Sequence, residues 1–210
     1  MSFDDKDMKG YTTIAKDTVQ SQTVINKSRF ICHVKGVSTT EEAIDFIAEI
    51  SKKHYDATHN CYAFVLPDYA KFSDDGEPQG TAGIPILECI KKQRLFGVAA
   101  VVTRYFGGIK LGAGGLTRAY SSSTAATLAL CKKIELAPSV KLTFELSYDG
   151  YKGLLQKLSD KYKTQIDYDE IISVAVTVKQ VNAEEAEEFI RSYTSGKIIP
   201  RQSQPFLEEI

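Results

Sequence analysis

The chain has 210 residues, of which 43% are hydrophobic and 25% are charged, and its net charge at pH 7 is -1. This composition is typical of one large or two small globular domains, and the near-neutral charge excludes a global electrostatic attraction to nucleic acid. No apolar run approaches the ~18 residues of a membrane span, the first ten residues (MSFDDKDMKG) are unlike a signal peptide, and the four cysteines form no C-x-x-C pair. We therefore expect a cytoplasmic protein with reduced thiols and no membrane partner.

The N-terminal part of the chain predicts an α+β domain. The expected elements are, in chain order, one or two strands within Thr23–Val37 around an Asn26-Lys27 turn, a helix entered through a capping box at Ser38–Glu42, a strand at Cys61–Leu66, a short helix capped by Thr81, a strand at Val98–Tyr105 and a helix at Leu116–Cys131. The Val98–Tyr105 segment is apolar on both faces, which is typical of a strand in the centre of a sheet.

The C-terminal part predicts a second domain. Apolar residues alternate strictly with polar ones from Val140 to Tyr148, which indicates a half-buried strand. Helical and alternating stretches then follow in the order β-α-β-β-α-β, so we expect a ferredoxin-like domain. The period changes at Ala137-Pro138-Ser139, which places the domains at 1–137 and 138–210.

Two glycine-rich segments on either side of the Val98–Tyr105 strand are the main functional signal. Glycine permits positive φ and close approach to the backbone, and free N–H groups at a helix start favour an anion. The candidate anion- or RNA-binding residues are Arg104, Tyr105, Gly107, Gly108, Lys110, Gly112, Gly114, Gly115 and Arg118. The alternative interpretation is tight packing of strand, loop and helix. The segment contains neither a P-loop nor a dinucleotide-binding motif.

A second group of polar residues lies upstream. Asp74, Asp75 and Glu77 place three carboxylates around a glycine, which fits either a magnesium site or a solvated turn. His59 and Cys61 project to one face of a strand, as a nucleophile pair or as structural residues. We expect these residues to converge with the Arg104–Gly115 loop on one face. No residue is assigned a catalytic, cofactor-binding or metal-binding role.

Long stretches of this sequence resemble the YigZ/Impact family, in its bacterial two-domain branch. The resemblance is carried by residues 57–63 (ATHNCYA), 73–87 (SDDGEPQGTAGIPIL) and 103–116 (TRYFGGIKLGAGGL), with SRFI at residues 28–31. It implies an N-terminal domain like the second domain of ribosomal small-subunit protein five. It also implies a C-terminal domain like the last domain of elongation factor G.

The resemblance also implies a role in translation. Eukaryotic Impact proteins regulate translation and carry an additional N-terminal protein-binding domain that is not seen in this sequence. We therefore expect a non-enzymatic factor that binds RNA or the ribosome, with a further surface for a protein partner on the C-terminal domain. The alternative is an enzyme that binds a phosphorylated small molecule or nucleotide with magnesium. The sequence does not indicate an oligomeric state.

Overall fold

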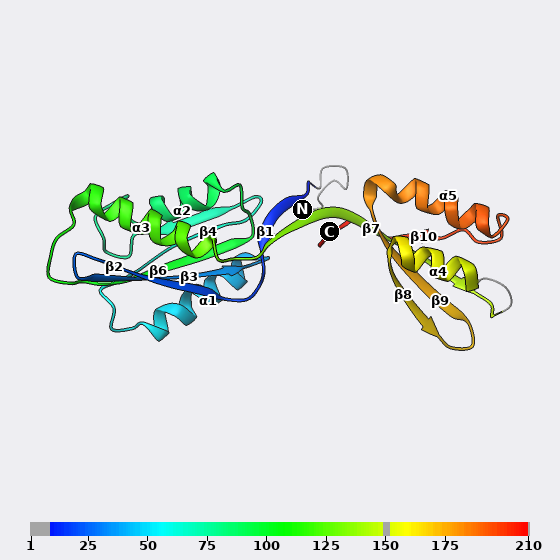
Figure 1. Ribbon diagram of the computed structural model, residues 1–210, viewed down its shortest axis with the longest axis horizontal. Coiled ribbons are helices and arrows are strands. Elements are labelled where there is room, and N and C mark those ends of the chain that lie inside the picture. Colours follow the sequence, from blue (N-terminus) through cyan, green and yellow to red (C-terminus); the bar gives the residue numbers. More distant parts are fainter. Residues whose placement is uncertain (1–8, 149–151, 210) are drawn as a thin grey trace. The chain divides into compact units, whose positions relative to one another are not determined.

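The protein consists of two compact units. The structure is a computed structural model that describes residues 9–148 and 152–209 (Figure 1). The N-terminal unit spans Tyr11–Glu135, and the C-terminal unit is formed mainly by the residues from Leu136 onward. Among the described residues, no helix is long and apolar enough to cross a membrane.

The N-terminal unit is a five-stranded antiparallel sheet covered by helices on both faces. The elements of this unit are β1 (Tyr11–Ile14), which lies outside that sheet, β2 (Val19–Ile25), β3 (Ser28–Gly36), α1 (Thr40–Lys53), β4 (His59–Val65), β5 (Ala70–Ser73), α2 (Gly83–Lys92), β6 (Val98–Tyr105) and α3 (Gly112–Leu128). The sheet order is β2-β3-β6-β4-β5, so β6 is central, as its apolar sequence predicted. Helices α2 and α3 pack on one face and α1 on the other (Figure 1).

Local sequence signals explain the entry into several of these elements. Asn26 and Lys27 both have positive φ, so they form the two-residue turn of the β2–β3 hairpin. At the start of α1, Thr39 Oγ1 accepts the N–H of Glu42, and the Glu42 carboxylate accepts the N–H of Ser38. This reciprocal pair confirms the predicted capping box and fixes the direction in which α1 leaves the sheet.

Two predicted helix starts are wrong. Helix α3 begins at Gly112 rather than Leu116, so Gly114 and Gly115 belong to its first turn. Helix α2 has Ala82 at its N-cap, and the Thr81 hydroxyl donates to the carbonyl of Pro78 instead of capping the helix. The carboxylate of Asp74 provides the cap from outside the helix. This contact links segments that are separate in sequence, so a local motif does not reveal it.

The C-terminal unit follows the predicted succession of strand, helix, strand, strand, helix and strand, and ends with one further strand. Its elements are β7 (Lys133–Leu146), α4 (Lys152–Lys161), β8 (Lys163–Tyr168), β9 (Ile172–Lys179), the 3-10 turn η1 (Gln180–Asn182), α5 (Ala183–Tyr193), β10 (Arg201–Gln202) and β11 (Phe206–Glu209). Strand β7 pairs with β9 on one side and with β10 and β11 on the other, and β8 pairs with β9, all antiparallel. Leucines of α4 and alanines of α5 pack on this sheet in a separate core.

Strand β7 runs without interruption through Pro138, where the sequence placed the domain boundary. Pro138 pairs with Leu207, and its neighbours Ala137 and Ser139 continue the same ladder. The division between the two units falls between Glu135 and Leu136. Proline is tolerated in a strand wherever its missing N–H is not needed by a neighbour.

A buried histidine lies on the α1 side of the sheet. His33 is 1% exposed, and neither of its ring nitrogens has a hydrogen-bond partner among the described residues. Its ring centroid lies 5.2 Å from that of His54. Burial, followed by the charges of Lys53 and His54, lowers the pKa of His33 to about 4.

This histidine predicts a loss of stability in acid. Because the folded pKa lies below the unfolded value, the unfolded chain takes up the proton first as the pH falls. The free energy of unfolding should decrease by about 3 kcal/mol between pH 6.5 and pH 4 on account of His33 alone. Urea denaturation at several pH values should show that the free energy of unfolding of His33→Leu depends less steeply on pH than that of wild type. Equal slopes for the two proteins would contradict this.

Candidate functional site

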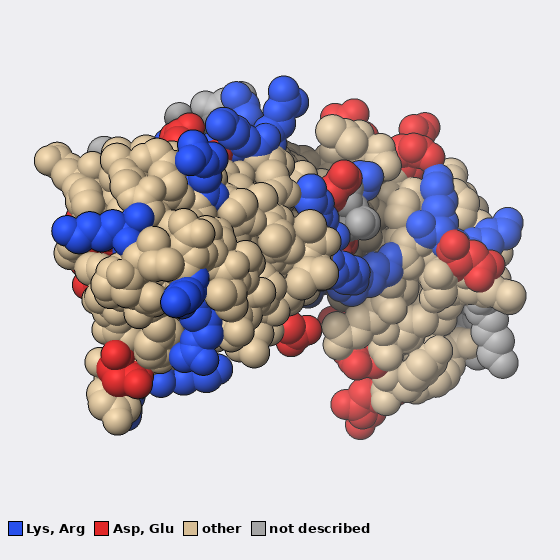
Figure 2. Space-filling view, turned by 60° about the vertical axis from the view of Figure 1, so that its left-hand side comes forward, with Lys and Arg blue, Asp and Glu red and all other residues tan. Residues whose placement is uncertain are grey.

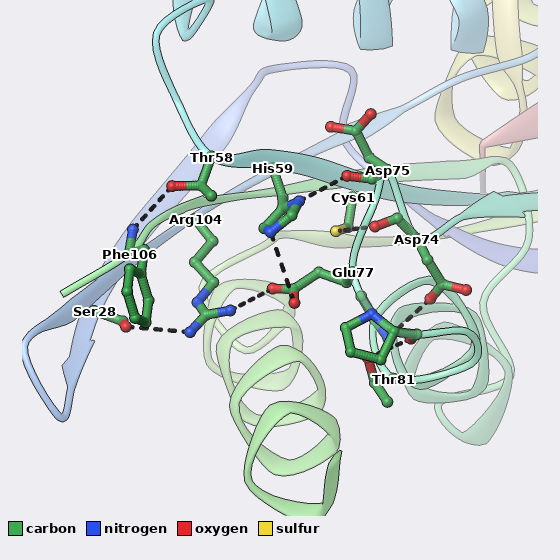
Figure 3. A network of polar contacts seen from close by, with 12 residues as sticks. Ser28, Thr58, His59, Cys61, Asp74, Asp75, Glu77, Thr81, Arg104 and Phe106 are labelled. Atoms are coloured by element: carbon green, nitrogen blue, oxygen red, sulfur yellow. Dashed lines mark hydrogen bonds and ion pairs between the residues drawn. The ribbon is translucent and has the colours of Figure 1, made fainter. Parts of the chain in front are cut away.

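Three predicted site segments meet on one face of the N-terminal unit. They are the start of β4 with His59 and Cys61, the loop Asp74–Gly80 between β5 and α2, and the end of β6 with Arg104 (Figure 3). His59 Nδ1 lies 2.7 Å from the carbonyl oxygen of Asp75, and the thiol of Cys61 lies 3.0 Å from the carbonyl oxygen of Asp74. These contacts tie the loop to the edge of the neighbouring strand.

Glu77 is the centre of this arrangement. Its Oε1 accepts hydrogen bonds from Arg104 Nη1 at 2.7 Å and from the Tyr120 hydroxyl of α3 at 2.8 Å. Its Oε2 lies 3.8 Å from His59 Nε2. Glu77 is 7% exposed and Arg104 is 5% exposed, so this is a buried ion pair. One carboxylate thus joins a loop, a strand and a helix.

Arg104 is therefore not a surface cation, contrary to its predicted role in anion binding. Its guanidinium group is paired with Glu77, and Nη2 donates to Ser28 Oγ at 3.4 Å. The same group contacts two aromatic rings and lies 5.5 Å from the centroid of Phe30 and 5.4 Å from that of Phe106. A charged group that is desolvated and neutralised in this way holds the site together instead of meeting a phosphate.

The two aspartates of the loop are occupied by backbone donors. Asp74 accepts the N–H groups of Gly80, Ala82 and Gly83 at 2.8, 3.0 and 2.8 Å, which caps α2. Partial burial acts to raise the pKa of Asp74, but these three donors outweigh it and hold that pKa below its usual value. Asp75 Oδ2 accepts the N–H of Asn60 at 2.6 Å.

The geometry therefore favours the turn interpretation over a magnesium site. Both aspartates already accept backbone N–H groups, and Glu77 is paired with Arg104. Among the described residues, no group of three or more histidine, cysteine or acidic side chains is arranged to hold a metal ion.

Cys61 and His59 do not form a nucleophile pair. Cys61 is fully buried, and its sulfur lies 3.3 Å from the Tyr120 hydroxyl. Burial raises the pKa of the Cys61 thiol, so the thiolate is disfavoured. His59 is turned toward Glu77 and Asp75 (Figure 3). Both residues have a structural role: their contacts with Asp74, Asp75 and Tyr120 hold the segments that surround Glu77.

The glycines of the β6–α3 loop have different roles. A Cβ atom on Gly107 would lie 2.0 Å from the carbonyl carbon of Lys27, so this position requires close backbone approach. Gly108 and Gly112 have positive φ, and a Cβ there would meet nothing within 4 Å. In Figure 1 this loop and the β2–β3 turn lie side by side at the left-hand end of the unit.

The remaining predicted residues of the loop are exposed. Lys110 and Arg118 are exposed and form no ion pair with a described carboxylate, while Phe106 is 47% exposed. Arg118 and Leu111 line a groove of about 840 Å³ between α2 and α3, together with Lys92. We call Lys92, Phe106, Lys110, Leu111 and Arg118 the loop–groove surface.

Tyr105 is held by protein contacts. Its hydroxyl donates to Asp56 Oδ1 at 3.0 Å and lies 3.0 Å from His54 Nδ1. The guanidinium group of Arg29 lies over its ring, 4.3 Å from the centroid. Phe106 is fixed through its backbone N–H, which donates to Thr58 Oγ1 at 3.0 Å, and its ring lies against the Arg104 guanidinium but is otherwise exposed.

Sequence reasoning missed several residues that complete the site. Tyr120 was seen only as part of a helix rich in small residues, yet it contacts Glu77, Cys61 and Phe30. Ser28 accepts hydrogen bonds from Arg104 and from the N–H of Gly107. The only available signal was that both residues lie inside or beside the motifs that contain the candidate residues.

The Glu77–Arg104 pair predicts strongly coupled effects on stability. Glu77→Gln and Arg104→Met should each lower the free energy of unfolding by about 3–5 kcal/mol, because each leaves a buried charge without its partner. The double variant should lose clearly less than the sum. Urea denaturation measures all three.

A matched control is the exposed pair Lys91–Glu88, whose charged groups are 3.9 Å apart. Glu88→Gln should change stability by less than about 1 kcal/mol. Additive effects of Glu77→Gln and Arg104→Met would show that the two charges do not stabilise one another.

Comparison with known proteins places the chain in a family. A model of the Impact N-terminal domain matches residues 26–128. The IMPACT family member YvyE of Bacillus subtilis (strain 168) is 40% identical over 195 residues, covering 90% of this chain and 89% of that protein. The IMPACT family member YigZ of Escherichia coli (strain K12) is 32% identical over 182 residues, covering 83% and 89%.

The fold has a counterpart among solved structures. A crystal structure described as that of a hypothetical protein matches with a TM-score of 0.63 and 30% identity, covering 97% of this chain and 98% of that one. The mixed α/β architecture in two units is therefore shared with an experimentally determined structure. Because relatives of at least 30% identity match over most of its length, this chain belongs to the IMPACT family.

Proposed function

We propose that this protein is a non-enzymatic cytoplasmic factor that binds RNA or the ribosome and regulates translation. The observation that supports this most strongly is the loop–groove surface. Phe106 presents an exposed ring on a loop that continues into Lys110, and the next residue, Leu111, lines the same groove as Arg118. Two cations on the groove, Lys92 and Arg118, and an exposed aromatic ring on the loop that leads to it suit a flexible polyanion with stackable bases.

The charge of this surface is local. In the left-hand part of Figure 2, blue lysine and arginine side chains are spread over the surface with few red carboxylates between them. The chain as a whole has a net charge of -1, so a general attraction to nucleic acid is not available. Binding would depend on a few defined cations and would weaken with added salt.

The buried contacts around Glu77 argue against the enzymatic alternative. Glu77 is neutralised by Arg104, Asp74 is a helix cap, and burial disfavours the thiolate of Cys61. A general base or nucleophile must reach a substrate with a free lone pair. The carboxylates of Glu77 and Asp74 already accept hydrogen bonds from other groups of the protein, so the geometry favours binding over catalysis.

The finer fold likenesses belong to the same proposal. The strand order of the C-terminal unit, with β7 and β9 in the middle, supports a ferredoxin-like domain and, with it, a likeness to the last domain of elongation factor G. We propose that the N-terminal unit is like the second domain of ribosomal small-subunit protein five. The acidic helix α5, with Glu184 and Glu188 exposed, is the proposed surface for a protein partner.

Removal of the surface cations should weaken binding of RNA in a salt-dependent way. A fluorescent single-stranded RNA oligonucleotide, followed by anisotropy at increasing salt, should show a slope that falls by about one for each of Lys110→Ala and Arg118→Ala. Each of the two variants should also co-sediment with ribosomes less than wild type does. Folding of each variant is checked by its thermal melt.

Lys71→Ala is the matched control. Lys71 is exposed and lies at the other end of the sheet from the β6–α3 loop. Its cross-strand partner Phe64 pairs with Ala99 near the start of β6, whereas the β6–α3 loop follows the end of β6. This variant should bind as wild type does. Equal binding by wild type and the double variant Lys110→Ala/Arg118→Ala, or no binding by either, would refute the proposed function.

Phe106 should contribute through stacking. Phe106→Leu keeps an apolar group over the Arg104 guanidinium but removes the ring, so affinity for the RNA should fall by about 1–3 kcal/mol. The salt slope should stay unchanged because no charge is lost. Phe106→Tyr keeps a ring and should restore affinity. If Phe106→Leu binds as tightly as wild type, bases do not stack on this residue.

A further inference from the structure

Strand β2 is an open edge of the N-terminal sheet. It pairs only with β3, in an unbroken register from Val19 opposite Val34 to Ile25 opposite Ser28. The other side of the strand has no strand neighbour among the described residues. An edge of this kind presents a row of backbone donors and acceptors to any strand that approaches it.

This edge lacks the features that normally prevent pairing. Its seven residues, VQSQTVI, contain no charge and no proline, and the register has no bulge. The opposite edge of the same sheet, β5, has four residues and carries Lys71. In the C-terminal unit, the edge strand β8 carries Lys163 and Asp167. The contrast indicates that β2 is kept available for a partner.

The hairpin determines which residues of β2 face outward. Because the turn has two residues, Ile25 and Ser28 exchange their backbone hydrogen bonds, and every second residue of β2 back from Ile25 also bonds to β3. The backbone N–H and C=O groups of Gln20, Gln22 and Val24 therefore point away from β3. These three residues are the ones a new strand would meet.

We propose that a second copy of this chain covers the edge, with β2 pairing antiparallel to β2 around a two-fold axis at Gln22. In this register Gln22 lies opposite itself, and Gln20 lies opposite Val24 of the other copy. All three outward residues then become hydrogen-bonded pairs. A shift by two residues in either direction leaves one of the three without a partner inside the strand, so this register is the most complete.

The side chains also match in this register. On the face that packs on the core, Val19 of one copy meets Ile25 of the other, and both are half-buried against that core. On the opposite face, Val24 is 62% exposed in the single chain, and in the dimer the side chain of Gln20 from the other copy lies beside it and covers it. Such cross-strand apolar pairs add to the stability of an antiparallel pair.

Charge complementarity at the ends of β2 supports the same occupant. Asp17 precedes the strand and Lys27 lies in the turn that follows it, and both are exposed. With Gln22 on the two-fold axis, Asp17 of each copy falls beside the β2–β3 turn of the other, within reach of Lys27. The interaction occurs twice by symmetry. The result is a closed dimer with one ten-stranded sheet, because two five-stranded sheets join at their β2 edges.

The oligomeric state tests this directly. Sedimentation velocity of the full chain over a range of concentrations should show a reversible monomer–dimer equilibrium. Gln22→Pro removes an N–H that points away from β3, so the monomer should keep its fold and its thermal melt, while dimer formation is lost. Lys71→Glu, on the β5 edge, should leave the dimer unchanged. A wild-type protein that stays monomeric at every accessible concentration would overturn the proposal.

A charge exchange tests the register. Asp17→Lys and Lys27→Asp should each raise the dimer dissociation constant about tenfold, because each places like charges beside one another at both ends. The double variant Asp17→Lys/Lys27→Asp should recover the affinity of wild type. A dimer that survives Gln22→Pro, or a double variant as weak as the single ones, would show that the copies associate elsewhere or in another register.

Discussion

The buried ion pair between Glu77 and Arg104 is the interaction on which the organisation of the N-terminal unit depends. Two charges removed from water carry a large desolvation penalty, which is offset only when their remaining hydrogen-bonding groups find partners. Tyr120, from a helix, donates to Glu77, and Ser28, from another strand, accepts from Arg104 Nη2, whereas Arg104 Nε has no partner among the described residues. The loop between β5 and α2, the end of β6 and the first half of α3 are therefore fixed together.

This pair also connects the interior to the surface. The Arg104 guanidinium contacts the rings of Phe30 and Phe106, so its position influences where the exposed ring of Phe106 lies. Two residues further along the chain from Arg104 the backbone leaves the sheet, and Gly107 contacts the β2–β3 turn too closely for any side chain. A binding loop held by buried electrostatics and backbone contact is preorganised, which lowers the entropy lost when it binds a ligand.

Hydrophobic pattern and turn chemistry predicted most of the elements, because those signals are local. The apolar run of β6 implied a central strand, Asn26-Lys27 implied a hairpin, and Ser38–Glu42 implied a helix start. The failures at Arg104 and Thr81 share a cause. Arg104 is buried because Glu77 pairs with it from another segment, and α2 is capped by Asp74 from outside the helix.

A similar limit applies to glycine and proline. Gly112, Gly114 and Gly115 have low intrinsic helix propensity, which predicted a loop, yet α3 includes all three because its packing on the sheet and on α2 outweighs that preference. Pro138 read as a boundary but lies inside β7. Propensity described these residues correctly in isolation, and tertiary contacts decided the outcome.

The proposed dimer bears on how the loop–groove surface would work. In a β2 pair centred on Gln22, the turn residues Asn26 of the two copies are eight positions apart along the pair, roughly 26 Å at 3.3 Å per residue. Each turn contacts Gly107, which begins the segment leading to Lys110, so the dimer presents two loop–groove surfaces on one particle. A few cations around one ring bind a polyanion weakly, whereas two such surfaces on a single RNA bind with a high effective concentration at the second site. Self-association through an uncharged edge strand would thus convert a modest local surface into a bivalent one, without requiring the strongly basic composition that this chain lacks.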